Sequence, residues 1–194
     1  MPATPRSPWR HLPNAISLLR MVLALPIGWA ILAMQPRMAL GLIAVAGISD
    51  GLDGFIARRY HWQSRLGGIL DALADKLLLV ACFLLLAWVG MAPWWLALLV
   101  CGRDVVIVAG ALAWRLFIGP IRPEPSSLSK ACTLLQIVYL LAVLVAASGW
   151  PSPPLAPLAM LAAVLCIASG LDYVLRWSRR AWVTWHARDP DSPR

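Results

Sequence analysis

Long apolar stretches separated by short polar segments dominate this chain of 194 residues. Each stretch is close to the roughly 20 residues that an α-helix needs to cross a bilayer. The stretches are 14–34, 38–57, 66–91, 93–118, 131–149 and 154–175. Lipid offers no water to the backbone, so a spanning segment must be a helix or part of a closed barrel. Because no stretch alternates apolar and polar residues as barrel strands do, we expect an all-α integral membrane protein with six transmembrane helices.

The composition excludes an ordinary soluble domain. Hydrophobic residues make up 60% of the chain, charged residues make up 13%, and the mean hydropathy is +0.73. Soluble domains carry about 25% charged residues, roughly twice this share. Four tryptophans stand at the ends of the expected spans, where indole rings favour the membrane interface: Trp88, Trp94, Trp95 and Trp150.

Basic residues gather on one side of the six expected helices. On that side lie Arg6, Arg10, Arg58, Arg59, Arg65, Arg115, Arg122, Lys130, Arg176, Arg179, Arg180, Arg188 and Arg194. The opposite side keeps only Arg37. This asymmetry predicts that both termini are cytoplasmic. The net charge of +8 and the pI of 10.2 therefore reflect orientation, and we expect no nucleic-acid partner, because no basic stripe with interleaved aromatic residues appears.

Three segments follow from this pattern. Residues 1–13 are expected to form a cytoplasmic N-terminal segment, residues 14–180 a six-helix transmembrane domain, and residues 181–194 a short, disordered cytoplasmic tail. The four cysteines are scattered singly through the spans, as Cys82, Cys101, Cys132 and Cys166. This spacing is typical of buried apolar thiols and matches no disulfide framework.

Four aspartates interrupt the second and third expected spans. Asp50 and Asp53 are three residues apart and Asp71 and Asp75 are four apart, so each pair shares one face of a helix. A connection of about ten residues makes the two helices antiparallel neighbours, and the pairs can converge at the cytoplasmic boundary. Four adjacent carboxylates stay ionised only beside a cation, and oxygen ligands suit two Mg²⁺ or Mn²⁺ ions.

A structural alternative is that these aspartates cap helices or pair with nearby basic residues, namely Arg58, Arg59 and Lys76. Four acids at helical spacing inside apolar spans favour a functional site. Small residues beside them, such as Gly51 and Gly54, leave room for a ligand to approach the backbone.

The acidic segments resemble the signature of the class I CDP-alcohol phosphatidyltransferase family. The matching residues read Asp50-x-x-Asp53-Gly54-x-x-Ala57-Arg58, then eight residues, then Gly67-x-x-x-Asp71-x-x-x-Asp75. The resemblance implies a six-helix membrane bundle that transfers a phosphatidyl group from a CDP-linked donor to an alcohol and releases CMP. It also implies that the four aspartates hold two metal ions and that Asp75 is the general base. The implied donor-binding residues are Gly54, Ala57, Arg58, Ser64 and Gly67.

The opening "PNAISLLR" is similar to the glycerol-acceptor branch of this family, which contains phosphatidylglycerophosphate synthases and cardiolipin synthases of the CDP-alcohol type. Charged residues in or near the spans, Arg20, Arg103 and Lys130, are candidates for acceptor binding. Arg103 has an alternative, structural reading, in which Asp104 neutralises it locally. Phosphatidylglycerophosphate synthases typically carry a second lysine where this chain has Cys132, which favours phosphatidylglycerol over glycerol 3-phosphate as the acceptor.

Two readings from other classes remain. The four aspartates are also compatible with the ion site of a divalent-cation transporter, although no internal repeat typical of transporters appears. A structural membrane protein without chemistry is the third reading. For the enzyme, the resemblance implies CDP-diacylglycerol, an alcohol acceptor and membrane lipids as partners, a homodimer, and a multi-pass location in a bacterial-type inner membrane with the active site at the cytoplasmic face.

Overall fold

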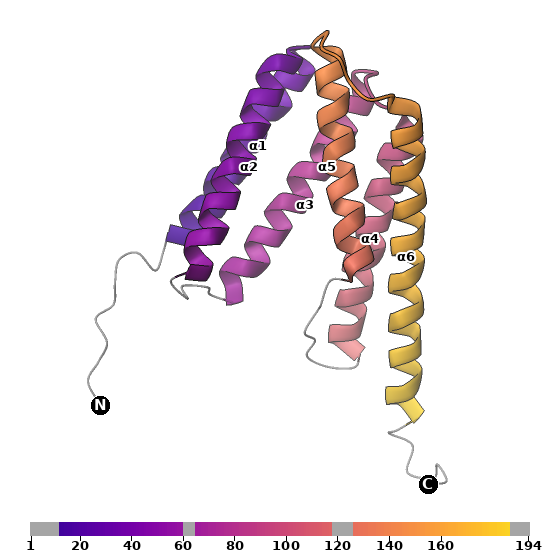
Figure 1. Cartoon of the computed structure of the whole chain (residues 1–194). Coiled ribbons are helices and arrows are strands. Elements are labelled where there is room, and N and C mark those ends of the chain that lie inside the picture. The colour runs from indigo at the N-terminus through magenta and orange to yellow at the C-terminus, as the bar shows by residue number, and fades with distance from the viewer. Residues whose placement is uncertain (1–11, 60–64, 118–125, 187–194) are drawn as a thin grey trace, which may run out of the picture. The chain divides into compact units, whose positions relative to one another are not determined.

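The structure, a computed structural model, describes residues 12–59, 65–117 and 126–186, with side chains from 22–49, 75–116 and 126–180. These residues form helices and no strand, which confirms the all-α prediction (Figure 1). The helices are α1 (Leu12–Leu32), α2 (Pro36–Arg59), α3 (Arg65–Trp88), α4 (Trp94–Phe117), α5 (Ser127–Ala147) and α6 (Leu155–His186).

Each helix corresponds to one of the six apolar stretches. The largest differences between expected and observed boundaries lie at the polar ends of the helices. Helix α5 begins at Ser127, four residues before the expected span, because the Ser126 Oγ accepts a hydrogen bond from the Ser129 N–H at 3.1 Å and caps the helix. Helix α6 continues to His186, since no proline follows before Pro190. The first six residues of the expected tail, 181–186, are therefore helical, and 187–194 lie outside the described residues.

Three helices are long and apolar enough to cross a membrane when only the described residues are considered: Trp94–Leu116, Ser127–Ala147 and Leu155–Arg180. Two shorter apolar segments occur in α1 and α2, at Val22–Leu32 and Pro36–Ser49. Large apolar side chains are exposed along the long helices, for example Leu116 at 71% and Leu175 at 69%. An exposed apolar surface of this kind suits a protein whose surroundings are lipid.

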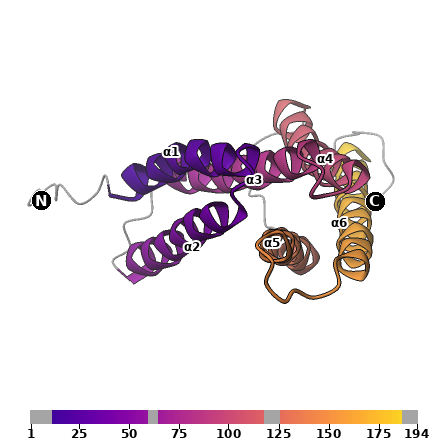
Figure 2. The ribbon, with the colours of Figure 1, turned by 90° about the horizontal axis from the view of Figure 1, so that it is seen from above.

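The helices divide between two compact units. The first unit contains α1, α2, α3 and residues 143–152 at the end of α5. Helix α1 packs against both α2 and α3 (Figures 1 and 2). The core of this unit includes the fully buried Ile27, Phe83 and Leu86. The α1–α3 contact is close at Gly28, where an added Cβ would lie 3.2 Å from Leu85 Cδ1.

Left-handed residues end three helices of the first unit. Gly90 follows α3 with φ of 79°, and Gly149 follows α5 with φ of 78°, a conformation that glycine adopts without steric cost. Met34 has φ of 54° after α1, where the Gln35 N–H donates to the Ala30 carbonyl at 2.9 Å. These caps satisfy the last carbonyls and let the chain reverse within a few residues.

The second unit contains α4, α5 up to residue 142, and α6. Helices α4 and α6 pack together around Tyr173, whose hydroxyl donates to the Ile107 carbonyl at 2.9 Å. Trp114 and Trp177 meet edge to face with their ring centroids 4.8 Å apart. Gly110 makes room for Tyr173, because an added Cβ at Gly110 would lie 2.8 Å from the Tyr173 ring.

Candidate functional site

The four signature aspartates lie in two helices of the first unit. Asp50 and Asp53 are in the second half of α2, and Asp71 and Asp75 are in the first half of α3. Both helices are unbroken through these positions, so the spacing of three and four residues is helical spacing, as predicted. We expected α2 and α3 to be neighbours, and in the described part of the unit each packs on α1.

Of the four carboxylates, only that of Asp75 belongs to the described side chains, and Asp75 is exposed. The side chains of Asp50, Asp53 and Asp71 lie outside the described residues, as do those of Ala57 and Arg58 and the surroundings of Gly54 and Gly67. Ser64 and its neighbours at 60–64 are likewise outside. The predicted convergence of the acidic pairs and the donor-binding set therefore stay predictions.

The side-chain chemistry of the four aspartates nevertheless fits a divalent cation. Four carboxylates within two helices offer oxygen ligands only, which hard cations such as Mg²⁺ and Mn²⁺ prefer. Elsewhere, the described side chains contain no group of three or more His, Cys, Asp or Glu residues that could hold a metal. The aspartates of α2 and α3 therefore stay the metal-binding candidates that the sequence predicts.

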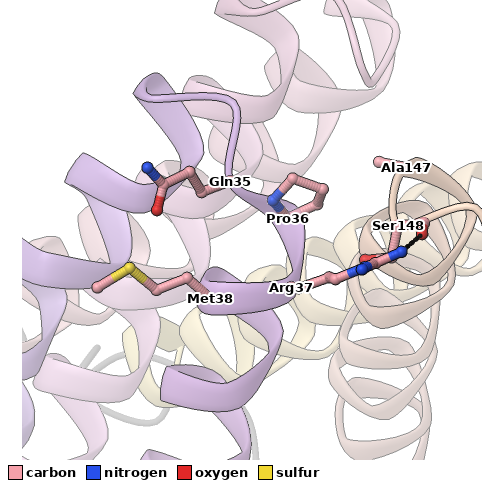
Figure 3. Close-up of a pocket in the computed structure, with 6 residues that line it drawn as sticks. All are labelled: Gln35, Pro36, Arg37, Met38, Ala147 and Ser148. Carbon is pink, nitrogen blue, oxygen red and sulfur yellow. Dashed lines mark hydrogen bonds between the residues drawn. The ribbon is translucent and has the colours of Figure 1, made fainter.

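A cleft of about 480 Å³ lies in the first unit, where α2 begins and α5 ends (Figure 3). It is lined by Gln35, Pro36, Arg37, Met38, Ala147 and Ser148. Arg37 donates to the Ser148 carbonyl at 3.1 Å and lies 5.9 Å from the centre of the Trp150 ring. Asp50 is 14 positions further along the sequence of α2, or about 20 Å along the helix axis, so this cleft is not the aspartate site.

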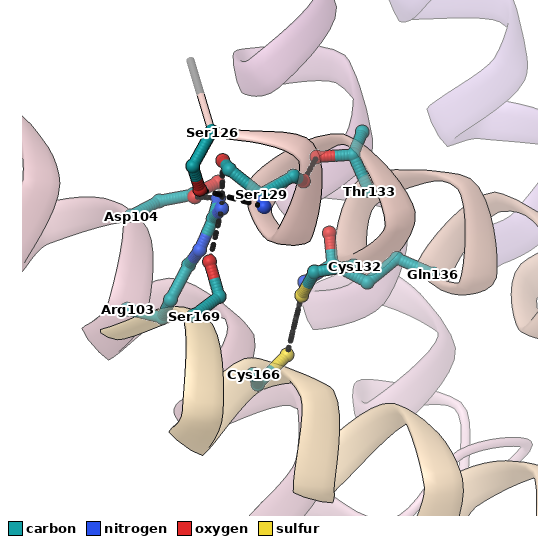
Figure 4. Close-up of polar contacts among 9 residues, drawn as sticks. All are labelled: Arg103, Asp104, Ser126, Ser129, Cys132, Thr133, Gln136, Cys166 and Ser169. Carbon is teal, nitrogen blue, oxygen red and sulfur yellow. Dashed lines mark hydrogen bonds and ion pairs between the residues drawn. The ribbon is translucent and has the colours of Figure 1, made fainter. Parts of the chain in front are cut away.

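A buried polar cluster lies in the second unit, where Arg103 of α4 meets α5 and α6 (Figure 4). One guanidinium nitrogen donates to Asp104 Oδ1 at 2.5 Å. The other donates to Ser169 Oγ at 2.9 Å and also to Ser129 Oγ. The side chain of Arg103 is 2% exposed and that of Asp104 is 10% exposed. One arginine therefore binds three residues, one from each of three helices.

Local pairing of Arg103 with Asp104, the alternative considered from the sequence, is what the structure contains. Burial of an unpaired guanidinium is costly, and the adjacent carboxylate offsets most of its charge. The Arg103 Nε has no hydrogen-bond partner among the described residues. Arg103 thus presents one spare donor in a cluster that is otherwise internally satisfied.

The other acceptor candidates have different settings. Lys130 is exposed in the first turn of α5, where its N–H bonds to the Ser126 carbonyl at 3.1 Å. Arg20 belongs to α1, and its side chain lies outside the described residues. Ser129, the residue before Lys130, accepts a hydrogen bond from Arg103. The start of α5 therefore contacts α4 through the polar cluster.

Sequence reasoning missed the contact between Cys132 and Cys166. Their sulfur atoms are 3.4 Å apart, and both residues are buried, as are Cys82 and the adjoining Gln136. The Gln136 Nε2 donates to Cys166 Sγ at 3.1 Å. Burial was expected for all four cysteines and is found for three of them, whereas Cys101 is half-buried. The pairing of Cys132 with Cys166 depends on how α5 and α6 align, which the spacing of residues in the sequence does not reveal.

Comparison with known proteins adds a family and several relatives. Residues 10–175 match the family described as CDP-alcohol phosphatidyltransferase. The chain is 33% identical over 161 residues to the human protein named cardiolipin synthase (CMP-forming), a match that covers 75% of this chain and 53% of that protein. It is 33% identical over 148 residues to the protein of the same name from Streptomyces coelicolor, covering 72% of this chain and 67% of the relative.

Another relative is the probable phosphatidylglycerophosphate synthase of Mycobacterium tuberculosis, 32% identical over 174 residues, with 86% of this chain and 81% of that protein covered. The chain spans about half the length of the human, rat and fruit-fly relatives that it matches. The matched region contains all four signature aspartates and five of the six helices up to their ends, together with most of α6. The chain therefore belongs to the CDP-alcohol phosphatidyltransferase family.

Proposed function

We propose that this chain is an integral-membrane phosphatidyltransferase that moves the phosphatidyl group of CDP-diacylglycerol to a glycerol-type alcohol and releases CMP. The observation that carries this proposal is the complete acidic signature, from Asp50 to Asp75, within helices α2 and α3. Relatives whose names describe CMP-forming cardiolipin synthesis support the same reaction class.

In this proposal Asp50, Asp53, Asp71 and Asp75 hold two Mg²⁺ or Mn²⁺ ions. When bound, such ions neutralise the negative oxygens of the pyrophosphate and of the CMP leaving group. Asp75, exposed on α3, accepts the proton of the acceptor hydroxyl as that oxygen bonds to the phosphatidyl phosphorus. The bond between this phosphorus and the CMP oxygen breaks, so the acceptor gains the phosphatidyl group.

The donor headgroup is proposed to lie against the residues between the acidic pairs. Gly54 and Ala57 leave room for the cytidine, and Arg58, Ser64 and Gly67 contribute to holding the nucleotide. A guanidinium suits this role because its fork of N–H groups matches phosphate oxygens. The acyl chains of the donor remain in the bilayer while its headgroup reaches the membrane boundary.

Phosphatidylglycerol is the acceptor that we favour, which makes cardiolipin the product. Arg103, an acceptor-binding candidate together with Arg20 and Lys130, is already paired with Asp104, so the cluster around it has little net positive charge to offer. Cys132 adds no charge, being buried against Cys166. Phosphatidylglycerol is a phosphodiester with a single negative charge, whereas glycerol 3-phosphate is a phosphomonoester with up to two. A cluster with little net positive charge suits the single charge better. Relatives named phosphatidylglycerophosphate synthase keep glycerol 3-phosphate as the second candidate.

The proposed enzyme spans a bacterial-type inner membrane six times, with both termini and the aspartate site at the cytoplasmic face. Its catalytic domain is 14–180, between a short N-terminal segment (1–13) and a C-terminal tail (181–194), and it acts as a homodimer. Support comes from the apolar helices and from the one-sided distribution of basic residues.

The test is an acceptor-resolved assay on the purified full chain in lipid–detergent micelles. CDP-diacylglycerol and Mg²⁺ or Mn²⁺ are supplied with either phosphatidylglycerol or glycerol 3-phosphate, and both CMP and the lipid product are measured. We expect CMP and cardiolipin in equal amounts from phosphatidylglycerol, and neither from Asp75→Asn. Product from glycerol 3-phosphate alone would overturn the acceptor assignment. Absence of CMP with both acceptors would overturn the glycerol-type acceptor and lead to other alcohols such as inositol phosphate or serine; failure of those as well would favour a cation transporter.

A further inference from the structure

Two polar layers follow each other along the contact between α5 and α6 (Figure 4). In the first layer, Ser129 and Ser169 bind the same nitrogen of Arg103. In the second layer, three residues further along α5 and three residues back along α6, Cys132 and Cys166 meet at 3.4 Å. Three residues of helix correspond to about 4.5 Å, so the thiol pair lies roughly one turn from the arginine.

Gln136 completes the second layer. Its Nε2 lies 3.1 Å from Cys166 Sγ and 3.5 Å from Cys132 Sγ, and it is fully buried. Its Oε1 has no hydrogen-bond partner among the described residues. A buried amide with one unused polar atom costs stability, which marks this layer as more than a packing contact.

From this geometry we propose that Cys132 and Cys166 form a site of reversible oxidation, in which a lipid-soluble hydroperoxide converts the thiol pair into a disulfide between α5 and α6. Buried thiols are ordinarily unreactive because the thiolate is the nucleophile. Here the amide N–H of Gln136 stabilises negative charge on Cys166, which makes Cys166 the attacking sulfur. Both thiols lie within apolar helices, so the oxidant must partition into lipid.

The chemistry balances in two steps. Cys166 Sγ attacks the outer peroxide oxygen, the O–O bond breaks, and the thiol proton goes to the alkoxide, which leaves as an alcohol. Cys132 Sγ then attacks the sulfenic sulfur of Cys166, forming the S–S bond and releasing water with the second thiol proton. Two thiols have lost two electrons and the peroxide has gained them.

Disulfide formation changes the contact between α5 and α6. A disulfide is about 2.05 Å long, so the two sulfur atoms must approach by roughly 1.4 Å from their present separation. Ser129 and Ser169 lie one turn away on the same faces, so any movement of α5 toward α6 at the disulfide would shift them around Arg103. This consequence rests on the proposed function: if Arg103 helps to position the acceptor, oxidation slows phosphatidyl transfer, because a displacement near 1 Å costs up to about 100-fold in rate.

The experiment exposes the full chain in nanodiscs of saturated lipid to cumene hydroperoxide, raising the dose until Cys101 or a methionine is oxidised. After alkylation and digestion, mass spectrometry measures each cysteine. We expect a linked Cys132–Cys166 peptide that dithiothreitol removes, while Cys82 of α3 stays a thiol. Oxidation of Cys101 or methionine without a Cys132–Cys166 linkage would overturn the proposal, as would equal linkage of Cys132 to other cysteines.

Variants assign the two roles. Cys132→Ser should leave a sulfenic acid on Cys166 that dimedone traps, whereas Cys166→Ser should give none on Cys132; the reverse result would contradict the assignment of the nucleophile. Gln136→Leu should slow linkage, and an unchanged rate would remove the amide from the mechanism. Asp75→Asn should form the linkage normally, so failure of the oxidation proposal is distinguishable from failure of the proposed transfer reaction.

Discussion

At the scale of single residues, the Arg103–Asp104 pair shows how a charge is kept inside an apolar helix. The guanidinium is neutralised by its own sequence neighbour and held by hydroxyls of two other helices. Breaking a buried pair by removing one partner leaves an uncompensated charge. The pair between Arg176 and Asp172, 2.6 Å apart, offers a comparison because its side chains are less buried, at 58% and 22% exposed.

Asp104→Asn is expected to lower the free energy of unfolding by about 3–5 kcal/mol, because it strands the Arg103 charge. Asp172→Asn should cost less, because the side chains of Asp172 and Arg176 are less buried. Unfolding by sodium dodecyl sulfate in mixed micelles, followed by circular dichroism, measures both. Combining Arg103→Met with Asp104→Leu should recover most of the loss. Equal effects of the two asparagine variants would contradict the burial argument.

The placing of functional side chains on one helix face was predictable from the sequence, because it depends only on spacing along that helix. The pairs Asp50/Asp53 and Asp71/Asp75 need only the helical repeat, and both lie in unbroken helices. The contact between Cys132 and Cys166 was not predictable. These residues are 34 positions apart in the sequence, and their contact requires a particular alignment of α5 with α6. Contacts of this kind depend on tertiary packing rather than on local periodicity.

At the scale of elements, hydropathy located all six helices but not their ends. The apolar stretch begins at 131, whereas α5 begins at Ser127 with a serine cap, and α6 runs eleven residues past the expected end at 175. Hydropathy reports the depth of a residue in lipid, and helices continue beyond that depth until a cap or a proline ends them. The polar ends were therefore the least predictable part of the fold.

Gly110→Ala is expected to weaken the packing of α4 on α6 by about 1–3 kcal/mol, because the new methyl group overlaps the Tyr173 ring. The ring cannot turn away without losing its bond to the Ile107 carbonyl. Gly102→Ala in the same helix meets nothing within 4 Å and should be neutral or stabilising. The same detergent unfolding measurement compares the two variants. A smaller cost for Gly110→Ala in a Tyr173→Leu background would support the overlap, and an unchanged cost would contradict it.

At the scale of the whole molecule, the distribution of basic residues predicts the orientation in the membrane. Arginines and lysines gather at the termini and at two of the connections, whereas the turn after α5 carries Gly149 and Trp150 without charge. A cysteine introduced at Ser152 should react with an impermeant maleimide from outside intact spheroplasts, and one introduced at Ser192 should react only after lysis. Labelling of both from the same side would contradict the proposal that the termini face the cytoplasm.

The central claim is that four aspartates on two helices form one metal-dependent centre for phosphatidyl transfer. The most direct measurement combines Mn²⁺ binding, followed by electron paramagnetic resonance, with CMP release for Asp50→Asn, Asp53→Asn, Asp71→Asn and Asp75→Asn. Each variant should lose Mn²⁺ affinity and at least about 100-fold in CMP release, whereas Asp172→Asn, at an exposed pair on α6, should lose neither. Retention of Mn²⁺ binding and CMP release in any two of the four variants would contradict the account.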